Sequence, residues 1–339
     1  MMKDKVTSID VARRAGVSQS AVSRVFTPGA SASPRPSRRS TKAAEELGYR
    51  PNPIARAMIT GKSRIIGLVV AYLDNQFYPI ALERLSRSLQ ARGYHVLIFL
   101  AENATAEVAP VMEELIAYQV DGIVTASVTM TNDLTNLCEA AGIPVVMFNR
   151  GQDDPRLSEV TSDNVAGGRT VANYLVAGGH ERIAHIAGLQ EASTGRDRAR
   201  GFVEALADHG RTPVAVVDGR YDRDIASALT RELFGAADRP DAVFVGNDHM
   251  ALAVMDTLRF ELGLSVPDDV SVVGYDDVPI ASWAAYDLTT IRQPVNRMVD
   301  ATVDALLSRI EGDTEPRHIL IPGPLIQRGS ARKPKGFKT

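Results

Sequence analysis

Apolar runs rich in Val and Ile alternate with longer segments of helical periodicity from residue 64 onward. Amphipathic segments such as YPIALERLSRSLQARG (78–93) separate these runs. Nine of the runs are candidate strands: RIIGLVVAY, YHVLIFLA, DGIVTAS, IPVVMFN, SEVTSD, RIAHIAG, VAVVDG, DAVFVGN and VSVVGYD. The alternation predicts a parallel sheet with helices on both faces. Because the segment holds too many βα units for one open sheet, we expect two doubly wound lobes that bind ligand beyond the carboxyl ends of their strands.

The chain before residue 64 shows no strand pattern and is expected to form short helices. Thr7 is placed to cap the first helix, and Asp10, three residues later, completes a capping box. Gly16 then provides a turn, and Ser18 caps a second helix whose apolar residues recur at helical spacing. Two short helices joined by a glycine turn predict a helix-turn-helix motif.

The second helix has an outward face of small and hydrogen-bonding side chains: Gln19, Ser20, Ser23 and Arg24. Small serines allow the helix to approach a DNA backbone closely, and Gln and Arg carry donors that read base edges in the major groove. Ala21 stands at the third helical position, where a carboxylate would repel a phosphate. The alternative is a solvated helix face with no target.

Charge is distributed unevenly along the chain. Residues 1–64 carry thirteen Lys and Arg but four Asp and Glu, a net charge of +9, whereas the remainder carries −12. A basic head on an acidic body favours binding of a polyanion such as DNA. The single cysteine, Cys138, permits no internal disulfide. With neither a signal-peptide pattern nor an apolar run of about 18 residues, we expect a cytoplasmic protein.

Two N-terminal segments, TSIDVARRAGVSQSAVSRVF (7–26) and AAEELGYRPNPIARAMITGKSRIIGLVV (43–70), resemble the start of the LacI/GalR family of bacterial transcriptional regulators. The resemblance continues in the same order through the body. It is carried by DNQFYP, VDGIV, IPVVMFNR, SDNVAGG, GGHERIAHIAG, GNDHMALAVMDTLR, VPDDVSVVGYDDVP, LTTIRQP and PLIQRGS. It implies a helix-turn-helix head, all α, and an α/β body of two doubly wound lobes like those of periplasmic binding proteins.

The resemblance also implies DNA contacts. Gln19, Ser20 and Arg24 fall where the family reads bases, and Thr7, Ser18 and Ser23 fall where it holds phosphates. A hinge helix is implied at residues 53–60, within a hinge and linker segment at 50–63. Its apolar wedge for the minor groove would be Met58, flanked by Asn52 and Ala55.

The third helix departs from the family pattern. The family usually has a Thr-Arg pair near the start of this helix and an inward Val four residues after the Thr. Pro36 and Ser37 stand at the first two places and Ser40 at the third. A polar side chain at a packing position buries less apolar surface, so we expect a head of reduced stability.

The domain boundaries follow from these assignments. We expect a DNA-binding domain at 1–49, a hinge at 50–63, a two-lobed body at 64–330 and a basic tail at 331–339. The N-lobe would comprise about 64–160 and 291–319, and the C-lobe about 161–288 and 320–330. By the resemblance, three crossovers would join the lobes, near Val160–Ser162, Leu288–Gln293 and Ile319–Pro324.

By resemblance, effector contacts map onto residues of both lobes: Phe77, Tyr78, Asn149, Thr194, Arg198, Tyr221, Asn247 and Asp276. Arg150 and Trp283 are second choices, and Asp163 is a candidate at the lobe hinge. Amides, carboxylates and guanidinium groups suit neighbouring hydroxyls, and aromatic rings suit the apolar face of a pyranose. We favour a sugar or sugar derivative. The arginines could instead bind an acidic sugar, and the aromatics could hold a purine.

Three other classes of function are disfavoured. His180 and His185 are five residues apart rather than the four of a zinc-protease helix, and they fall on a strand pattern. This spacing does not predict a metal site. No glycine-rich phosphate loop follows any strand, so no nucleotide cofactor is expected either. A periplasmic solute-binding protein would not need the basic head.

We therefore predict a transcriptional repressor, not an enzyme, that binds double-stranded operator DNA under the control of a small molecule. A homodimer is expected because one recognition helix covers a half-site, and a palindromic operator matches a two-fold protein. The sequence leaves open whether the effector releases or promotes DNA binding.

Overall fold

The computed structural model describes residues 6–26, 33–50, 62–101 and 105–335. The chain divides into two compact units, Met1–Arg64 and Ile65–Thr339. We call the first unit the head and the second the body. The predicted hinge contacts Asn52, Ala55 and Met58 lie outside the described residues.

The head consists of three helices, α1 (Ser8–Ala15), α2 (Gln19–Val25) and α3 (Pro34–Leu47). The predicted capping box is present at α1, where Asp10 accepts hydrogen bonds from the backbone N–H and hydroxyl of Thr7 at 3.0 and 2.7 Å. Gly16 ends α1 in the left-handed region at φ 63°, where a glycine has no steric penalty. Ser18 caps α2 through the backbone N–H of Ala21.

The three helices enclose a small apolar core made of Val11, Ala12, Ala15, Val22, Ala43 and Ala44. Phe26 and Tyr49 close one side with an edge-to-face contact at 5.9 Å. Arg14 of α1 forms an ion pair with Glu46 of α3 at 2.7 Å on the surface. These contacts confirm the predicted helix-turn-helix fold.

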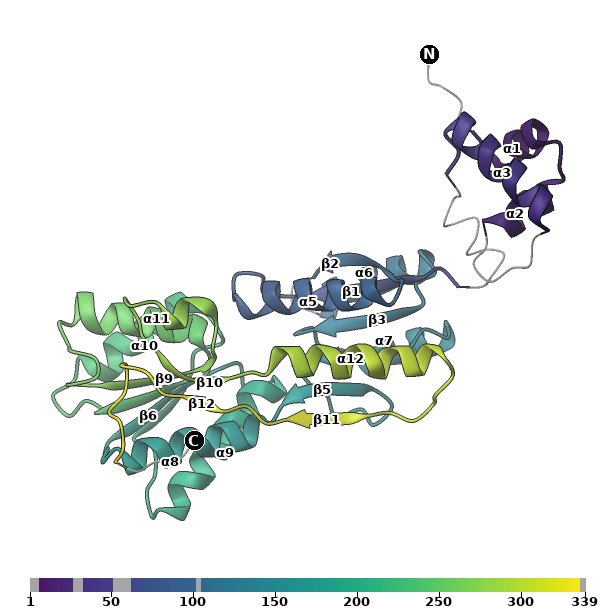
Figure 1. The fold of residues 1–339 in the computed structure, drawn as a ribbon. Helices are drawn as coiled ribbons and strands as arrows, with labels where there is room; N and C mark the ends of the chain where they lie inside the picture. Colours follow the sequence, from purple (N-terminus) through teal and green to yellow (C-terminus); the bar gives the residue numbers. More distant parts are fainter. Residues whose placement is uncertain (1–5, 27–32, 51–61, 102–104, 336–339) are drawn as a thin grey trace. The chain divides into compact units, whose positions relative to one another are not determined.

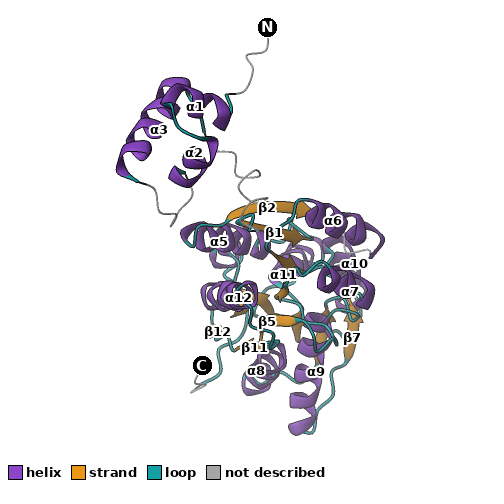
Figure 2. Ribbon diagram, turned by 90° about the vertical axis from the view of Figure 1, so that its right-hand side faces the viewer, coloured by secondary structure: helices purple, strands orange, loops and turns teal. Residues whose placement is uncertain are grey.

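The N-lobe of the body has a six-stranded parallel sheet in the order β11-β5-β4-β3-β1-β2. Its strands are β1 (Ile65–Val70), β2 (His95–Leu100), β3 (Gly122–Ala126), β4 (Val145–Phe148), β5 (Ser158–Ser162) and β11 (His318–Ile321). Its helices are α5 (Phe77–Ala91), α6 (Thr105–Ala117), α7 (Asn132–Ala140) and α12 (Val295–Ile310). Helices α5 and α12 lie side by side on one face, and α6 and α7 cover the other (Figure 2).

The C-lobe repeats this plan in the order β12-β10-β9-β8-β6-β7, with only β12 antiparallel (Figure 1). Its strands are β6 (Ile183–Ala187), β7 (Ala215–Asp218), β8 (Ala242–Val245), β9 (Ser271–Asp276), β10 (Thr289–Arg292) and β12 (Leu325–Ile326). Its helices are α8 (Asn164–Ala177), α9 (Ser193–Asp208), α10 (Arg223–Phe234), α11 (Asp248–Asp256), and the short η1 (Thr257–Glu261) and η2 (Pro279–Ser282). Successive residues of a β-strand point to opposite faces of the sheet, so each face of the C-lobe sheet forms its own apolar core. Helices α8 and α9 pack on one face, and α10 and α11 pack on the other.

The chain passes between the lobes three times: from β5 to α8, from β10 to α12, and from β11 to β12. β5 ends at Ser162, β10 at Arg292 and β11 at Ile321, so each strand extends a few residues beyond the lobe boundary expected from the sequence. The predicted architecture of two doubly wound lobes is confirmed. Within the described residues, no helix has the length and apolar character needed to cross a membrane.

Candidate functional site

The carboxyl ends of strands from both lobes converge on one cavity, which we call the cleft cavity. Its lining comprises Tyr72, Asp74, Asn75, Tyr78, Asn149, Arg150, Thr194, Arg198, Tyr221, Asn247 and Asp276. Eight of the eleven residues proposed from the sequence are therefore brought together, in the place that open α/β sheets use for ligands. Tyr72, Asp74 and Asn75 also line the cavity, but they were not among the effector contacts expected from the sequence. Their position directly after the β1 apolar run is the signal that could have indicated them.

Arg198 is held on every side within the cleft. Its Nε donates to Asn164 Oδ1 at 2.8 Å, and its Nη1 donates to the Gly246 carbonyl at 2.6 Å. The guanidinium lies 3.7 Å above the Tyr275 ring, and Nη2 is 3.8 Å from Asp276 Oδ1. Since only 3% of this side chain is exposed, these contacts fix both its position and its charge.

Asp276 connects the two lobes from the end of β9. Its carboxylate accepts a hydrogen bond from Gln293 Nε2, on the crossover after β10, at 2.7 Å. It accepts another from Asn75 Nδ2, in the N-lobe, at 3.4 Å. Its backbone has an unusual φ of 130°, a conformation typical of functional positions. Burial raises the pKa of this carboxyl, while the nearby Arg198 opposes the shift.

Two more contacts join the lobes across the cleft. The backbone N–H of Gly151 donates to Ser193 Oγ at 2.9 Å, and His249 Nε2 lies 3.3 Å from Asp74 Oδ2. The free volume of the cleft cavity is about 20 Å³, which accommodates about one water molecule. A ligand as large as a monosaccharide therefore requires the lobes to move apart.

Asn149 and Arg150 follow β4 and leave polar atoms without partners. Asn149 has φ 69°, a left-handed conformation that asparagine tolerates, and its Nδ2 donates to the Tyr78 hydroxyl at 2.9 Å. The Tyr78 hydroxyl in turn contacts Ser127 Oγ. Among the described residues, Asn149 Oδ1 and Arg150 Nε and Nη1 have no hydrogen-bond partner. These buried atoms are available to a ligand.

The remaining polar groups of the C-lobe are held by local structure. The Tyr221 hydroxyl donates to Thr194 Oγ1 at 3.0 Å. A Cβ at Gly188 would overlap the Tyr221 ring, so the glycine makes room for the ring. Asn247 caps α11 by accepting the Met250 N–H at 2.9 Å. This wall of the cleft is therefore ordered in advance of any ligand.

Three residues proposed from the sequence lie elsewhere. Phe77 is buried against Phe148, with ring centroids 6.1 Å apart. Asp163 caps α8 by accepting the Ala166 N–H at 2.9 Å, and it lines a separate cavity of about 290 Å³. Trp283 follows η2 and is 58% exposed. None of the three lines the cleft cavity.

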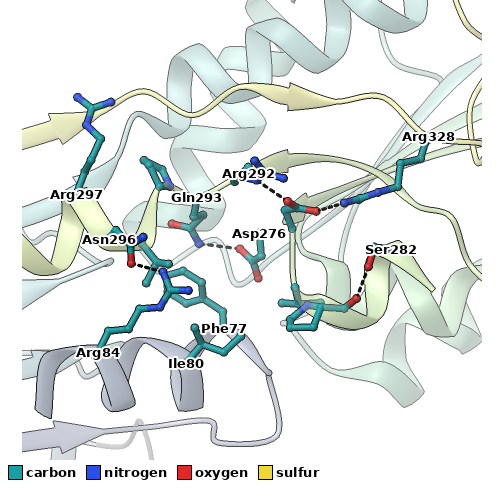
Figure 3. Close-up of a pocket in the computed structure, with 15 residues that line it drawn as sticks. Phe77, Ile80, Arg84, Asp276, Ser282, Arg292, Gln293, Asn296, Arg297 and Arg328 are labelled. Carbon is teal, nitrogen blue, oxygen red and sulfur yellow. Dashed lines mark hydrogen bonds and ion pairs between the residues drawn. The ribbon is translucent and has the colours of Figure 1, made fainter. Parts of the chain in front are cut away.

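Phe77 lines a larger cavity of about 670 Å³ at the crossover from β10 to α12, shown in Figure 3. Arg292 and Arg328 both donate to Asp277 here at 2.6 Å, so this carboxylate is paired on both sides. Asp276 and Gln293 also line this space, which therefore adjoins the cleft through a shared hydrogen bond.

In the head, predicted DNA contacts lie at the N-termini of α1 and α2 and along the exposed side of α2. Ser18, Gln19, Ser20 and Arg24 are exposed, and Ser23 is half-buried. Gln19 Nε2 donates to Ser8 Oγ at 3.1 Å, and the Ser18 and Ser20 hydroxyls are 3.0 Å apart. The helix N-termini present N–H groups of the kind that bind phosphate.

The histidines weighed as metal ligands belong to the C-lobe core. His185 stacks on Phe244, with ring centroids 4.5 Å apart, and His180 is fully buried with Nδ1 3.5 Å from Asp241 Oδ1. In the part of the chain that the structure describes, no three His, Cys, Asp or Glu side chains form a group that could hold a metal ion.

Comparison with known proteins gives matches over nearly the whole chain. The family of bacterial regulatory proteins of the lacI type matches residues 8–52, and the periplasmic binding protein-like domain matches residues 172–331. The transcriptional regulator CelR of Thermobifida fusca is 34% identical, and the alignment covers 94% of this chain and 96% of that protein. The transcriptional repressor PurR of Pectobacterium atrosepticum is 32% identical over 95% of each chain.

Solved structures of transcriptional regulators also match this chain over most of its length. The lac repressor dimer bound to operator and the anti-inducer ONPF superposes with a TM-score of 0.87 at 28% identity, over 96% of this chain and 99% of that one. The complex of CelR with cellobiose superposes with a TM-score of 0.73 at 32% identity, over 96% and 100% of the two chains.

Proposed function

Because the chain belongs to the LacI family of bacterial regulatory proteins and is a transcriptional regulator of that type, we propose that it is a repressor controlled by a small molecule in the cleft cavity. Like the lac repressor, whose dimer has been solved bound to operator, it binds operator DNA as a dimer, and it is not an enzyme. The chromosome is its target, so it acts in the bacterial cytoplasm. The effector is a sugar or a sugar derivative.

The convergence of buried polar side chains from both lobes carries this proposal. Thr194, Arg198 and Asn247 come from the C-lobe, and Tyr78 and Asn149 come from the N-lobe. All five are nearly inaccessible to solvent. Burying such groups is costly unless hydrogen bonds compensate them, and a polyhydroxylated ligand supplies those bonds.

Two classes of effector are candidates. CelR has been solved with cellobiose, and the lac repressor with the anti-inducer ONPF and with ONPG. A purine is the second candidate, because aromatic side chains such as Tyr78 and Tyr221 line the cleft cavity. The cleft favours the sugar class because polar hydrogen-bonding groups dominate its lining, and Tyr78 and Tyr221 are hydrogen-bonded to neighbouring hydroxyls.

Control of DNA binding requires the effector to distinguish two arrangements of the lobes. Contacts such as Asn75 to Asp276 and Gly151 to Ser193 exist only when the lobes approach each other. A ligand that replaces or reinforces these contacts shifts the balance between the arrangements, and operator affinity changes with that balance.

A pair of substitutions separates the two activities. The operator is first selected from a random palindromic library with the full-length protein, and its binding is followed by fluorescence anisotropy. Arg24→Ala is expected to weaken binding by about 10- to 100-fold and to relax base preference, while ligand binding is unchanged. Asp276→Ala is expected to bind the operator normally and to lose the response to the effector identified by a thermal-shift screen of sugars and purines.

Asp300→Ala, on the exposed side of α12, serves as the control for removal of an acidic side chain. It should leave both activities at wild-type values. Selection of the same operator by Arg24→Ala, or a wild-type effector response in Asp276→Ala, would contradict the proposal.

A further inference from the structure

Arg150 is the one charged residue of the cleft cavity whose hydrogen-bonding groups the described residues leave unsatisfied. Only 4% of the residue is exposed, and both Nε and Nη1 are buried without a partner. It makes no ion pair with an acidic side chain among the described residues. A buried guanidinium in this state carries a large desolvation cost, which a ligand of opposite charge would offset.

Arg198, in the same cavity, provides the contrast. Asn164, the Gly246 carbonyl and the Tyr275 ring satisfy its guanidinium, and Asp276 lies within ion-pair distance. Arg198 therefore needs no charged ligand. Arg150 has none of these compensating contacts, although it is equally buried.

The charges that line the cavity do not cancel. Arg150, Arg198 and Asp276 are its buried charged residues, and Asp276 balances Arg198. Asp74 is 69% exposed at the rim, where it faces His249 instead. One buried positive charge therefore remains, at Arg150.

We propose that the effector is a hydroxycarboxylic acid, such as a sugar acid, whose carboxylate binds Arg150 in the cleft cavity. This inference rests on the function proposed above and specifies its ligand. A carboxylate presents two acceptor oxygens in a plane that matches the guanidinium fork, and its single charge matches the single unbalanced charge. A phosphate ester would carry about two negative charges at neutral pH, more than the single positive charge of Arg150.

Asn149 is the reason why the proposed ligand carries hydroxyl groups beside its carboxylate. Its Oδ1 is a buried acceptor without a partner, so the ligand must also donate a hydrogen bond close to the carboxylate. A neutral sugar can donate that bond and accept from Arg150, but it leaves the buried charge uncompensated. A carboxylate without hydroxyls neutralises the charge but leaves Asn149 unsatisfied.

The test uses the full-length protein and isothermal titration calorimetry. The compounds are D-glucose and D-galactose, the matching acids D-gluconate, D-glucuronate and D-galacturonate, glucose 6-phosphate, and adenine. At least one acid should bind more than about tenfold tighter than its neutral counterpart. Arg150→Met should weaken that acid by about 100-fold, whereas Arg150→Lys should retain part of its affinity. Arg297→Met removes an exposed arginine of α12 and should change nothing.

Two further measurements test the charge argument, and the first does not depend on the compounds chosen. Arg150→Met should raise the melting temperature of the ligand-free protein, because it removes an uncompensated buried charge. A lower melting temperature would show that Arg150 is already compensated and would overturn the inference. Asn149→Asp places a carboxylate in the same cavity, and it should reduce the preference for acids over neutral sugars.

Tightest binding by a neutral sugar, the phosphate ester or adenine, with no effect of Arg150→Met, would also overturn the inference. The proposed function is tested separately by adding the bound compound to the protein–operator complex. An acid that binds through Arg150 but leaves operator affinity unchanged would refute control by the cleft and leave the assigned ligand class intact.

Discussion

Ser40 shows at the scale of one residue how a polar group weakens a small core. It lies on α3 with no exposed surface, and its Oγ has no hydrogen-bond partner among the described residues. We predict that Ser40→Ala stabilises the head by about 1 kcal/mol, because it removes a buried hydroxyl that folding leaves unsatisfied. Amide hydrogen exchange of α1 to α3 in the intact chain measures this change.

Ser37→Ala is the matched control. Ser37 is half-buried on the same helix, so the substitution changes helix propensity equally without removing a fully buried hydroxyl. An equal gain in protection from both variants would show that helix propensity, rather than burial, sets the effect.

The caps of the head could be predicted because they depend on near neighbours in the chain. Thr7 and Asp10 are three residues apart, as are Ser18 and Ala21. The hydrogen bond from Gln19 to Ser8 could not be predicted, since it depends on the angle at which α1 and α2 pack. Local rules therefore predict the ends of helices and say little about the side chains between helices.

At the scale of an element, strand β6 contains a titratable group at its centre. His185 stacks on Phe244 with the rings 7° from parallel, and its Nδ1 lies 2.9 Å from the Phe244 carbonyl. Burial lowers the pKa of His185 to about 4. The unfolded chain takes up this proton near pH 6.5, whereas the folded chain does so only near pH 4.

We therefore predict that the body loses stability as the pH falls from 6.5 towards 4. The loss attributable to His185 approaches about 3 kcal/mol at the lower pH. His185→Phe should remove this part of the slope, because a phenylalanine can stack on Phe244 and does not titrate. Denaturant unfolding at several pH values measures the difference.

Phe244→Leu controls for altered packing in the same core. It should lower the free energy of unfolding at every pH and keep the wild-type slope. Parallel curves for the wild type and His185→Phe would show that His185 does not contribute to the pH dependence.

The predicted strands agree with β1 to β9. Most of them are short apolar runs in a sheet covered on both faces, whereas β5 (SEVTS) is largely polar. No strand was predicted at β10, β11 or β12, and the segments of β10 and β11 were expected only as crossovers. These strands have four, four and two residues, and polar residues such as Thr289 and Thr290 break the apolar pattern of β10. Their pairing with strands already in place, rather than their own composition, makes them strands.

At the scale of the whole molecule, the cleft assembles residues as distant in sequence as Tyr78 and Asp276. The rule that ligands bind beyond the carboxyl ends of strands makes this convergence predictable. The rule cannot decide between neighbours on a helix: Phe77 and Tyr78 are about 100° apart on α5, so only one faces the cavity. Asp163 is similarly lost to the site because its carboxylate caps α8.

The dimer should use the exposed apolar side chains of the C-lobe. Phe260 on η1 is 82% exposed, and Trp283 after η2 is 58% exposed. Arg259 donates to the Ala285 carbonyl, so the segments that carry these two side chains are neighbours. Large exposed aromatic side chains on adjacent elements are typical of an interface between protein chains.

We predict that Phe260→Asp weakens the dimer at least about tenfold, because a two-fold interface places the new charge against the same apolar patch of both copies. Sedimentation equilibrium measures the dissociation constant. Operator affinity should fall with it, since a monomer engages one half-site. Leu320→Asp is the control, because Leu320 is 59% exposed on β11, at the edge of the N-lobe sheet opposite β2. Dissociation of Leu320→Asp, with Phe260→Asp still dimeric, would place the interface on the β11 edge instead.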